Sequence, residues 1–400
     1  MSTPAPPRPS LLLLAYLAFV SLGLPDGLIG VGWPSIRADF DVPTEAVGLV
    51  LTAGTVGYLT SSLVAGFTLA RIGVGWLLAG STLLASLALT GYATSPALVV
   101  MTACALVLGL GSGAVDSGLN AYAAGAFGPR HMNWMHAFFG LGVAIGPLVM
   151  TATLGLGLAW RWGYGVVAAS QLALAVAFAL TVRAWRDRAA TGAAAPSSTA
   201  AGPGPHKPIT PVRIRETLRL PAVWLGALAF AVYVAIEVAA GLWAFLLLTD
   251  GRGLTAGAAG VCVSGYWGSL FVGRLVQGVV SERLGTTRVL RGSLFGMVAG
   301  AALIALPAPA WVAVAGLLVL GFAAAPVFPL LTLSTVDRVG AGHADRAIGV
   351  QIAGAGVGAA LVPTGIGVLL GHTSVELLGA ALTVLAVALI LLQAGAARRR

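Results

Sequence analysis

The sequence predicts an all-α membrane protein with twelve transmembrane helices, arranged as two pseudo-symmetric six-helix bundles around a central cavity. Three observations support this fold class. The 400-residue chain is 58% hydrophobic and only 9% charged, whereas soluble domains are roughly 25% charged. Apolar stretches long enough to cross a bilayer recur along the chain. The second half of the chain repeats motifs of the first.

Apolar runs of roughly 20 residues or more define the predicted spans, and each is expected to be a helix because an open sheet cannot satisfy its backbone in lipid. They are residues 11–36, 45–70, 74–93, 97–122, 134–158, 163–183, 221–248, 255–281, 287–306, 311–336, 347–371 and 374–394.

A stretch of different composition separates the sixth span from the seventh. Ala, Pro, Ser, Thr and Gly dominate residues 189–205, and basic residues follow. Low-complexity composition of this kind is typical of a flexible linker. We therefore predict an N-terminal bundle (1–183), a cytoplasmic linker (184–220) and a C-terminal bundle (221–400).

The two predicted halves share a glycine and proline pattern. Matched residues, 211 to 216 positions apart, are Gly54 and Gly265, Gly57 and Gly268, Gly109 and Gly321, Gly140 and Gly356, and Pro147 and Pro363. Asp26 lies opposite Glu237 in the same register. Two repeated membrane halves that bury acidic side chains are typical of a secondary transporter.

The basic residues indicate the orientation. Arg37, Arg161 and Arg252 fall in one set of loops and Arg274 lies inside a span, while the rest of the 22 Lys and Arg occupy the other loops and the tails. Cytoplasmic loops carry the excess of Lys and Arg, which predicts cytoplasmic termini in a bacterial plasma or inner membrane. This clustering assigns the net charge of +9 to the lipid bilayer and not to nucleic acid.

Three acidic residues lie deep in predicted spans: Asp26, Asp116 and Glu237. An ionisable group there costs about 2.5–3.5 kcal/mol, so its default interpretation is functional, with a structural ion pair or helix–helix hydrogen bond as the alternative. Only Arg274 offers a counter-charge inside a span, and it cannot pair all three. A carboxyl that binds a proton in one conformation and releases it in another provides proton coupling, for which we predict Asp116 first and Asp26 second.

Helical spacing places other polar side chains beside these acids. Gly109, Gly113, Asp116 and Asn120 form one stripe, and Tyr233 precedes Glu237 by one turn. We expect these faces to converge on a central cavity. The solute-binding residues predicted for it are Asn120, His136, Tyr233, Glu237 and Gln351. A structural role for His136 is equally compatible with its position.

The repeat breaks at one informative place. Asp116 corresponds to Phe328, which lies between Pro326 and Pro329. Proline in a helix interior removes a hydrogen bond and bends or breaks the helix. The sequence therefore predicts that Pro326 and Pro329 kink or unwind the tenth span, and it concentrates the proton chemistry in the first half.

Several segments resemble a known family. Residues 66–75 look like the loop signature between spans two and three of the major facilitator superfamily, although Ala70 stands where that signature usually has aspartate. The second copy, residues 278–285, has Glu282 in the acidic place. The resemblance implies the superfamily's two-bundle transporter fold, with the charge contact of the first copy altered.

Three further segments look like the fucose permease-like branch of proton-linked sugar transporters. They are Gly109 to Asn120 followed by Asn133 and Phe138 to Gly140; Glu237 with Trp243, Trp267, Gly268, Gly273 and Arg274; and Gly321 to Pro329 with Gln351 and Pro363.

This resemblance implies that Asp116 links proton and sugar movement, and it adds Trp243 to the solute-binding set. Asp26 lies one turn from the position matched to the branch's first-span aspartate. The implied function is proton-coupled symport of a sugar or sugar-like small solute by alternating access. We expect a monomer without cofactor, driven by the proton gradient.

Other classes fit less well. The sequence has no HExxH, P-loop or GxSxG motif, and the glycine run at 354–359 lies mid-span with no strand before it, so an enzyme is not expected. Cys104 and Cys262 are isolated and predict no metal site. The main alternative is a proton-driven exporter of drugs or other amphipathic compounds, which the thin polarity and frequent aromatic residues favour.

Overall fold

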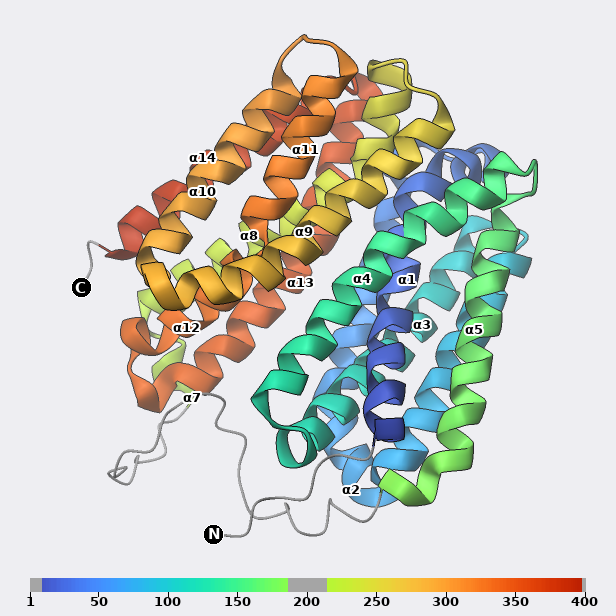
Figure 1. Cartoon of the computed structure of the whole chain (residues 1–400), viewed down its shortest axis with the longest axis vertical. Coiled ribbons are helices and arrows are strands. Elements are labelled where there is room, and N and C mark those ends of the chain that lie inside the picture. The colour runs from blue at the N-terminus through green and yellow to red at the C-terminus, as the bar shows by residue number, and fades with distance from the viewer. Residues whose placement is uncertain (1–8, 186–213, 398–400) are drawn as a thin grey trace. The chain divides into compact units, whose positions relative to one another are not determined.

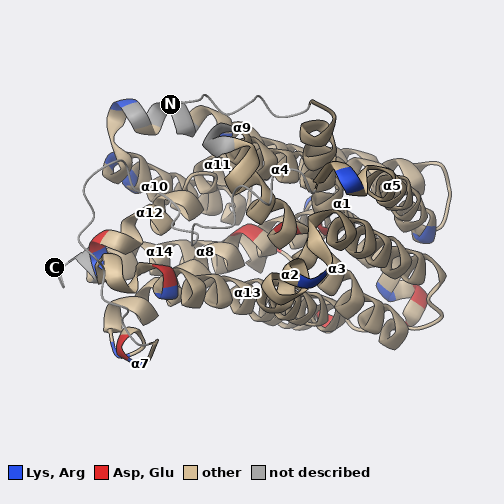
Figure 2. Cartoon of the chain, turned by 90° about the horizontal axis from the view of Figure 1, so that it is seen from below, with Lys and Arg blue, Asp and Glu red and all other residues tan. Residues whose placement is uncertain are grey.

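The structure is a computed structural model that describes residues 9–185 and 214–397, without the side chains of residues 128–130, 277–280, 282 and 396–397. The chain divides into two compact units, Met1–Ser197 and Ser198–Arg400. All regular elements in the described ranges are helices (Figure 1). Most of their length carries neither acidic nor basic residues (Figure 2). Most of the predicted linker, and the Glu282 side chain, lie outside the described residues.

The helices of unit 1 account for the first six predicted spans. They are α1 (Pro9–Phe40), α2 (Val47–Thr94), α3 (Leu98–Ala126), α4 (Gly128–Gly155) and α5 (Trp160–Thr181), with short 3₁₀ turns η1 (Thr44–Ala46) and η2 (Val182–Trp185). The long helix α2 contains two predicted spans, separated at Gly73 by a φ of +76°. Glycine adopts this conformation without steric cost, so the chain bends there and continues as a helix.

Unit 2 repeats this arrangement. Its elements are α7 (Ile214–Thr217), α8 (Pro221–Leu246), the π-helical turn η3 (Leu247–Gly251), α9 (Ala256–Leu284), α10 (Thr286–Ala305), α11 (Ala310–Ala324), α12 (Val327–Val339), α13 (Ala341–His372) and α14 (Leu377–Ala397). Gly285 separates α9 from α10 with a φ of +82°, as Gly73 does in α2.

The predicted break of the tenth span is confirmed. Helix α11 ends at Ala324 and α12 begins at Val327, on either side of Pro326. In the described ranges, 11 helical stretches are long and apolar enough to cross a membrane, and one of them, Thr44–Thr94, holds two predicted spans. The prediction of an all-helical fold with twelve spans is therefore confirmed.

Within each unit the helices pack as two layers. In unit 1, α1 packs mainly on α4, whereas α2 packs on α3 and α5. In unit 2, α8 packs mainly on α13, whereas α10 packs on α11 and α14, and α9 packs on α11. In each unit, layer A is the pair that contains the first helix: α1 with α4 in unit 1, and α8 with α13 in unit 2. The remaining helices of the unit form layer B. The layers meet chiefly through α1 and α5 in unit 1. In unit 2 they meet through α8 and α14, and through α12, which packs on α13 and α8.

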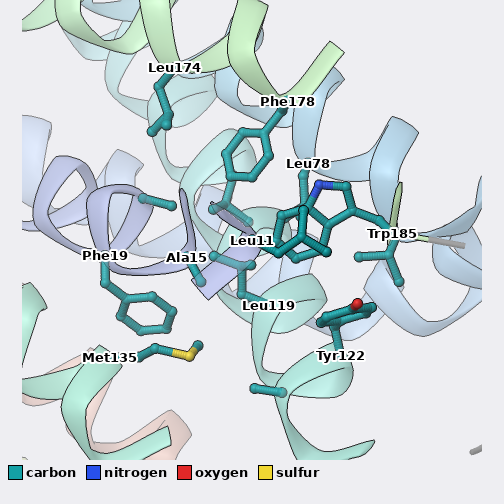
Figure 3. Packing of buried hydrophobic residues seen from close by; sticks show 14 of the residues in the cluster. Leu11, Ala15, Phe19, Leu78, Leu119, Tyr122, Met135, Leu174, Phe178 and Trp185 are labelled. Carbon is teal, nitrogen blue, oxygen red and sulfur yellow. The ribbon is translucent and has the colours of Figure 1, made fainter. Parts of the chain in front are cut away.

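An apolar cluster joins both layers of unit 1 at one end. Figure 3 shows Phe19 of α1 and Met135 of α4 close to side chains of α2, α3 and α5. Trp185 is fully buried in this cluster and donates from Nε1 to Thr181 Oγ1 at 3.2 Å. Packing of this kind holds membrane helices together by van der Waals contact, since lipid supplies no hydrophobic force between them.

Candidate functional site

Asp116 lies in the middle of α3 and receives two hydrogen bonds. The Tyr58 hydroxyl of α2 donates to Oδ2 at 2.7 Å, and Asn120 Nδ2 donates to Oδ1 at 3.0 Å. Both donors are neutral. None of the ion pairs among the described residues involves Asp116. Its carboxylate is therefore held by hydrogen bonds without a cation to balance its charge.

Glycines bring the two helices of this contact together. A methyl group added to Gly57 of α2 would overlap the Leu106 carbonyl oxygen of α3. One added to Gly113 of α3 would lie 2.5 Å from the Tyr58 carbonyl oxygen. Small residues allow this backbone contact between membrane helices. Tyr58 directly follows Gly57, so its hydroxyl reaches Asp116 because α2 and α3 lie so close.

Replacing Gly57 by Ala is expected to lower the unfolding temperature of the purified protein. The added methyl meets backbone, which cannot rotate away, so α2 and α3 must separate at a cost of about 1–3 kcal/mol. Gly66→Ala is the matched control in the same helix, since nothing lies within 4 Å of a methyl there. Equal unfolding temperatures of the two variants would contradict this account of the contact.

Asp26 of α1 is exposed, and among the described residues it has no hydrogen bond or ion pair. Gly27, beside it, packs against α4, where an added methyl would overlap the Val143 carbonyl oxygen. The two predicted proton sites, Asp26 and Asp116, are in the same unit.

Glu237 of α8 is the centre of a second polar cluster, in unit 2. The Tyr233 hydroxyl donates to Glu237 Oε2. Arg274 Nη2 of α9 lies 3.7 Å from Glu237 Oε1, and the Tyr266 hydroxyl donates to the Glu237 backbone carbonyl at 2.9 Å. The single arginine predicted inside a span thus has its acidic partner in the same unit.

The broken tenth span positions this cluster. Helix α11 ends at Ala324, and the Ala324 carbonyl oxygen lies 3.1 Å from the Tyr233 hydroxyl. A methyl added to Gly273 would lie 2.7 Å from the Phe322 carbonyl oxygen, so α9 touches the end of α11 directly beside Arg274. The end of α11 before Pro326 therefore lies against Tyr233 and against Gly273, the residue before Arg274.

Two predicted solute-binding residues are buried and hydrogen-bonded inside unit 2. Trp243 is 1% exposed and donates from Nε1 to the Pro363 carbonyl at 2.9 Å. Gln351 is 2% exposed, and its Oε1 accepts from Thr335 Oγ1 at 2.9 Å. Both side chains join helices of the unit, and a solute contacts them only if those helices move. Their binding role stays a prediction.

His136 of α4 is exposed, and its ring packs edge-on against Phe19 at 5.2 Å. One turn earlier, His131 Nδ1 is hydrogen-bonded to the Tyr16 hydroxyl at 2.7 Å. His131 and Tyr58 were not predicted from the sequence as site residues. Tyr58 had one available signal, its place beside Gly57 in the glycine pattern. His131 had none, since its partner is 115 residues away.

The sequence matches the Major Facilitator Superfamily over residues 15–363 and again over residues 241–399. Two similar solved structures are the nucleoside transporter NupG, at 15% identity and a TM-score of 0.74, and a D-xylose-proton symporter, at 14% and 0.72. The first match covers 97% of this chain and 98% of NupG, and the second covers 95% and 96%. No match was found among curated proteins. The structural likenesses establish the fold.

Proposed function

Because the chain belongs to the major facilitator superfamily, which consists of membrane transporters and not enzymes, we propose that it is a proton-coupled symporter of a sugar or sugar-like small solute. It works by alternating access, as a monomer with cytoplasmic termini in a bacterial inner membrane. The proton gradient supplies the energy, and the organisation is a bundle (1–183), a linker (184–220) and a second bundle (221–400).

The state of Asp116 carries this proposal. Among the described residues its carboxylate has two neutral donors and no cation, whereas Glu237 has Arg274. A proton is the simplest cation that neutralises Asp116 when water is excluded around it. A bound proton shifts the balance between conformations only if it binds one of them more tightly. Asp116, with Asp26 as a second site, supplies that difference in unit 1.

Asn120 supports a solute rich in hydroxyl groups. Its Nδ2 donates to Asp116, but its Oδ1 is buried and has no hydrogen-bond partner in the part of the chain that the structure describes. A buried acceptor without a donor is destabilising, and a solute hydroxyl would satisfy it. Asn120, His136, Tyr233 and Glu237 are the proposed solute contacts, and Trp243 and Gln351 join them when the helices of unit 2 shift.

The chemistry of the two structural neighbours is compatible with this class. One is named as a nucleoside transporter, and the other as a symporter of D-xylose and protons. Both solutes contain a sugar ring with several hydroxyl groups. A place in the fucose permease-like branch, inferred from the motifs around Asp116 and Glu237, is part of the same proposal.

Proton-driven export of amphipathic cations is the second candidate. Asp26 is exposed and has no partner among the described side chains, and an unpaired carboxylate attracts a cationic solute as well as a proton. Aromatic side chains gather in unit 2, where the Phe328 ring lies 5.0 Å from that of Phe230 and the Tyr266 ring 5.0 Å from that of Trp267. Aromatic faces bind organic cations.

Transport into liposomes separates the two candidates. The purified protein is reconstituted, a proton gradient is imposed, and uptake of D-xylose, L-fucose, uridine and the cationic dye ethidium is followed with and without a protonophore. We expect one of the neutral solutes to accumulate, and the protonophore to abolish it. If only ethidium moves, and it moves in the direction opposite to protons, the result contradicts symport and supports proton-driven export.

A further inference from the structure

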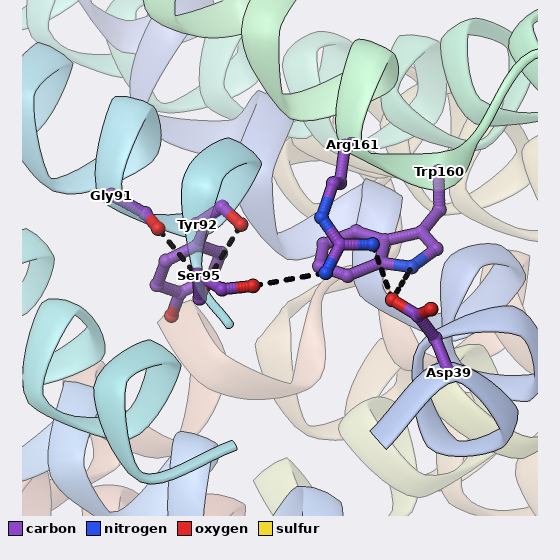
Figure 4. Close-up of polar contacts among 6 residues, drawn as sticks. All are labelled: Asp39, Gly91, Tyr92, Ser95, Trp160 and Arg161. Carbon is purple, nitrogen blue, oxygen red and sulfur yellow. Dashed lines mark hydrogen bonds and ion pairs between the residues drawn. The ribbon is translucent and has the colours of Figure 1, made fainter. Parts of the chain in front are cut away.

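An arginine ties three helix ends together in unit 1. Arg161, in the first turn of α5, forms an ion pair with Asp39 in the last turn of α1 (Figure 4). Its Nη2 donates to the Ser95 carbonyl at 2.9 Å, in the turn between α2 and α3. The guanidinium also lies 4.5 Å from the Trp160 ring, whose Nε1 donates to Asp39 at 3.2 Å.

An arginine does the same in unit 2. Arg252 follows α8, and its Nη2 lies 2.7 Å from Glu376 Oε2, immediately before α14. Its side chain is 6% exposed. It donates to three carbonyls in and beside the turn between α10 and α11: those of Ile304 at 3.1 Å, Leu306 at 2.8 Å and Ala308 at 2.8 Å.

These two contacts occupy matching places in the repeat with their charges exchanged. Arg252 is 213 positions after Asp39, and Glu376 is 215 positions after Arg161, within the offsets of the glycine pattern. In unit 1 the acid is on the first helix and the arginine on the last. In unit 2 the arginine directly follows the first helix and its terminal turn η3, and the acid precedes the last helix.

We propose that the two contacts are one device, a clamp present once in each half with opposite polarity, which keeps the two helix layers of that half together as it moves. The clamp of unit 1 is Asp39, Arg161 and the Ser95 carbonyl. The clamp of unit 2 is Arg252, Glu376 and the carbonyls of 304, 306 and 308. Each clamp joins the end of the unit's first helix, in layer A, to two parts of layer B. One is the start of the last helix, α5 or α14, and the other is the turn between α2 and α3 or between α10 and α11.

The layers need such a connection. Apart from α1 with α5 in unit 1, and α14 and α12 with the layer A helices in unit 2, each pair of helices from different layers contacts only lightly. Alternating access is largely a rocking of one half against the other, which requires each half to behave as a rigid body. Neither Asp116 nor Glu237 is a member of a clamp, so clamp variants leave the proposed proton site and solute contacts unaltered in sequence.

Helix dipoles make a sharp prediction about polarity. Cations are favoured at a helix C-terminus and anions at an N-terminus. The unit 2 clamp obeys this, with Arg252 after α8 and Glu376 before α14, whereas the unit 1 clamp opposes it. Exchanging the charges of unit 1 therefore creates the arrangement that unit 2 already contains, and removes an unfavourable orientation.

The test compares Asp39→Arg, Arg161→Glu and the double variant in the purified full-length protein. Each single change places like charges together, and is expected to lower the unfolding temperature by several degrees and to raise amide hydrogen exchange several-fold in residues 93–98. The double variant is expected to return both to wild-type values or better. Arg37→Gln is the control, because Arg37 lies in the same turn of α1 but donates to Thr44.

In unit 2 the same exchange combines Arg252→Glu with Glu376→Arg. The double variant is expected to recover only part of the unfolding temperature that each single variant loses. The new polarity opposes the dipoles there, and Arg252 is the more buried arginine with more carbonyl partners. The proposal is overturned if the unit 1 double variant lowers the unfolding temperature by as much as the two single variants do when their decreases are added. Single variants that match wild type in both measurements would also overturn it.

Discussion

Replacing Asp116 by Asn is expected to abolish solute accumulation driven by a pH gradient, while exchange of solute across the membrane continues. The amide imitates a permanently protonated acid, so the carrier no longer binds and releases a proton as it changes access. Asn keeps the size of Asp and can accept from Tyr58, which preserves the α2–α3 contact. Accumulation and exchange are measured in the same liposomes with whichever solute the panel identifies.

Two further variants make this result specific. Tyr58→Phe removes a donor to Asp116 but leaves its carboxylate, and is expected to keep gradient-driven uptake at a changed pH dependence. Asp116→Asn that accumulates solute as well as wild type would show that the main proton site lies elsewhere, and Asp26→Asn becomes the next variant to measure. An unchanged unfolding temperature for Asp116→Asn excludes misfolding as the cause of its loss.

Replacing Arg274 by Gln is expected to destabilise the protein by about 1–3 kcal/mol. Removing one partner of a fully buried ion pair costs about 3–5 kcal/mol, because the other charge is left uncompensated. The loss is smaller here because both side chains keep some exposure, 25% for Arg274 and 16% for Glu237, and their charged atoms are 3.7 Å apart. The measurement is the unfolding temperature of the purified protein.

The double variant Glu237→Gln with Arg274→Gln identifies the cause. With both charges removed, most of the lost stability is expected to return, since no uncompensated carboxylate remains. A double variant no more stable than Arg274→Gln would mean that the arginine contributes through its packing beside Gly273 and not through its charge. Glu237→Gln alone leaves an unpaired arginine and serves as the reciprocal single variant.

Contacts along one helix were predictable from the sequence. Asn120 lies one turn after Asp116, and Tyr233 one turn before Glu237, so helical periodicity alone places each pair on one face, and both hydrogen bonds are present. The break near Pro326 was equally predictable, because proline lacks the N–H that continues a helix. The spans follow from apolar length, since only helices can cross lipid without unpaired backbone groups.

Contacts between helices were decided only by the tertiary structure. Periodicity says which residues share a face, but not which neighbouring helix that face meets or at what distance. Hence the sequence singled out Arg274 as a counter-charge without naming Glu237 as its partner, and did not find Tyr58 beside Asp116. It also presented Gln351 as a solute contact, where the packing of unit 2 buries it against Thr335.

The repeat itself shows the same division. The sequence by itself determined that two halves exist, because matched glycines and prolines keep their spacing over more than 200 residues. It did not disclose that Asp39 and Arg161 correspond to Arg252 and Glu376, because exchanged charges look like a mismatch in an alignment of residue types. Only the folded units bring each pair together at the helix ends, where the Coulomb attraction is the same whichever helix carries the arginine.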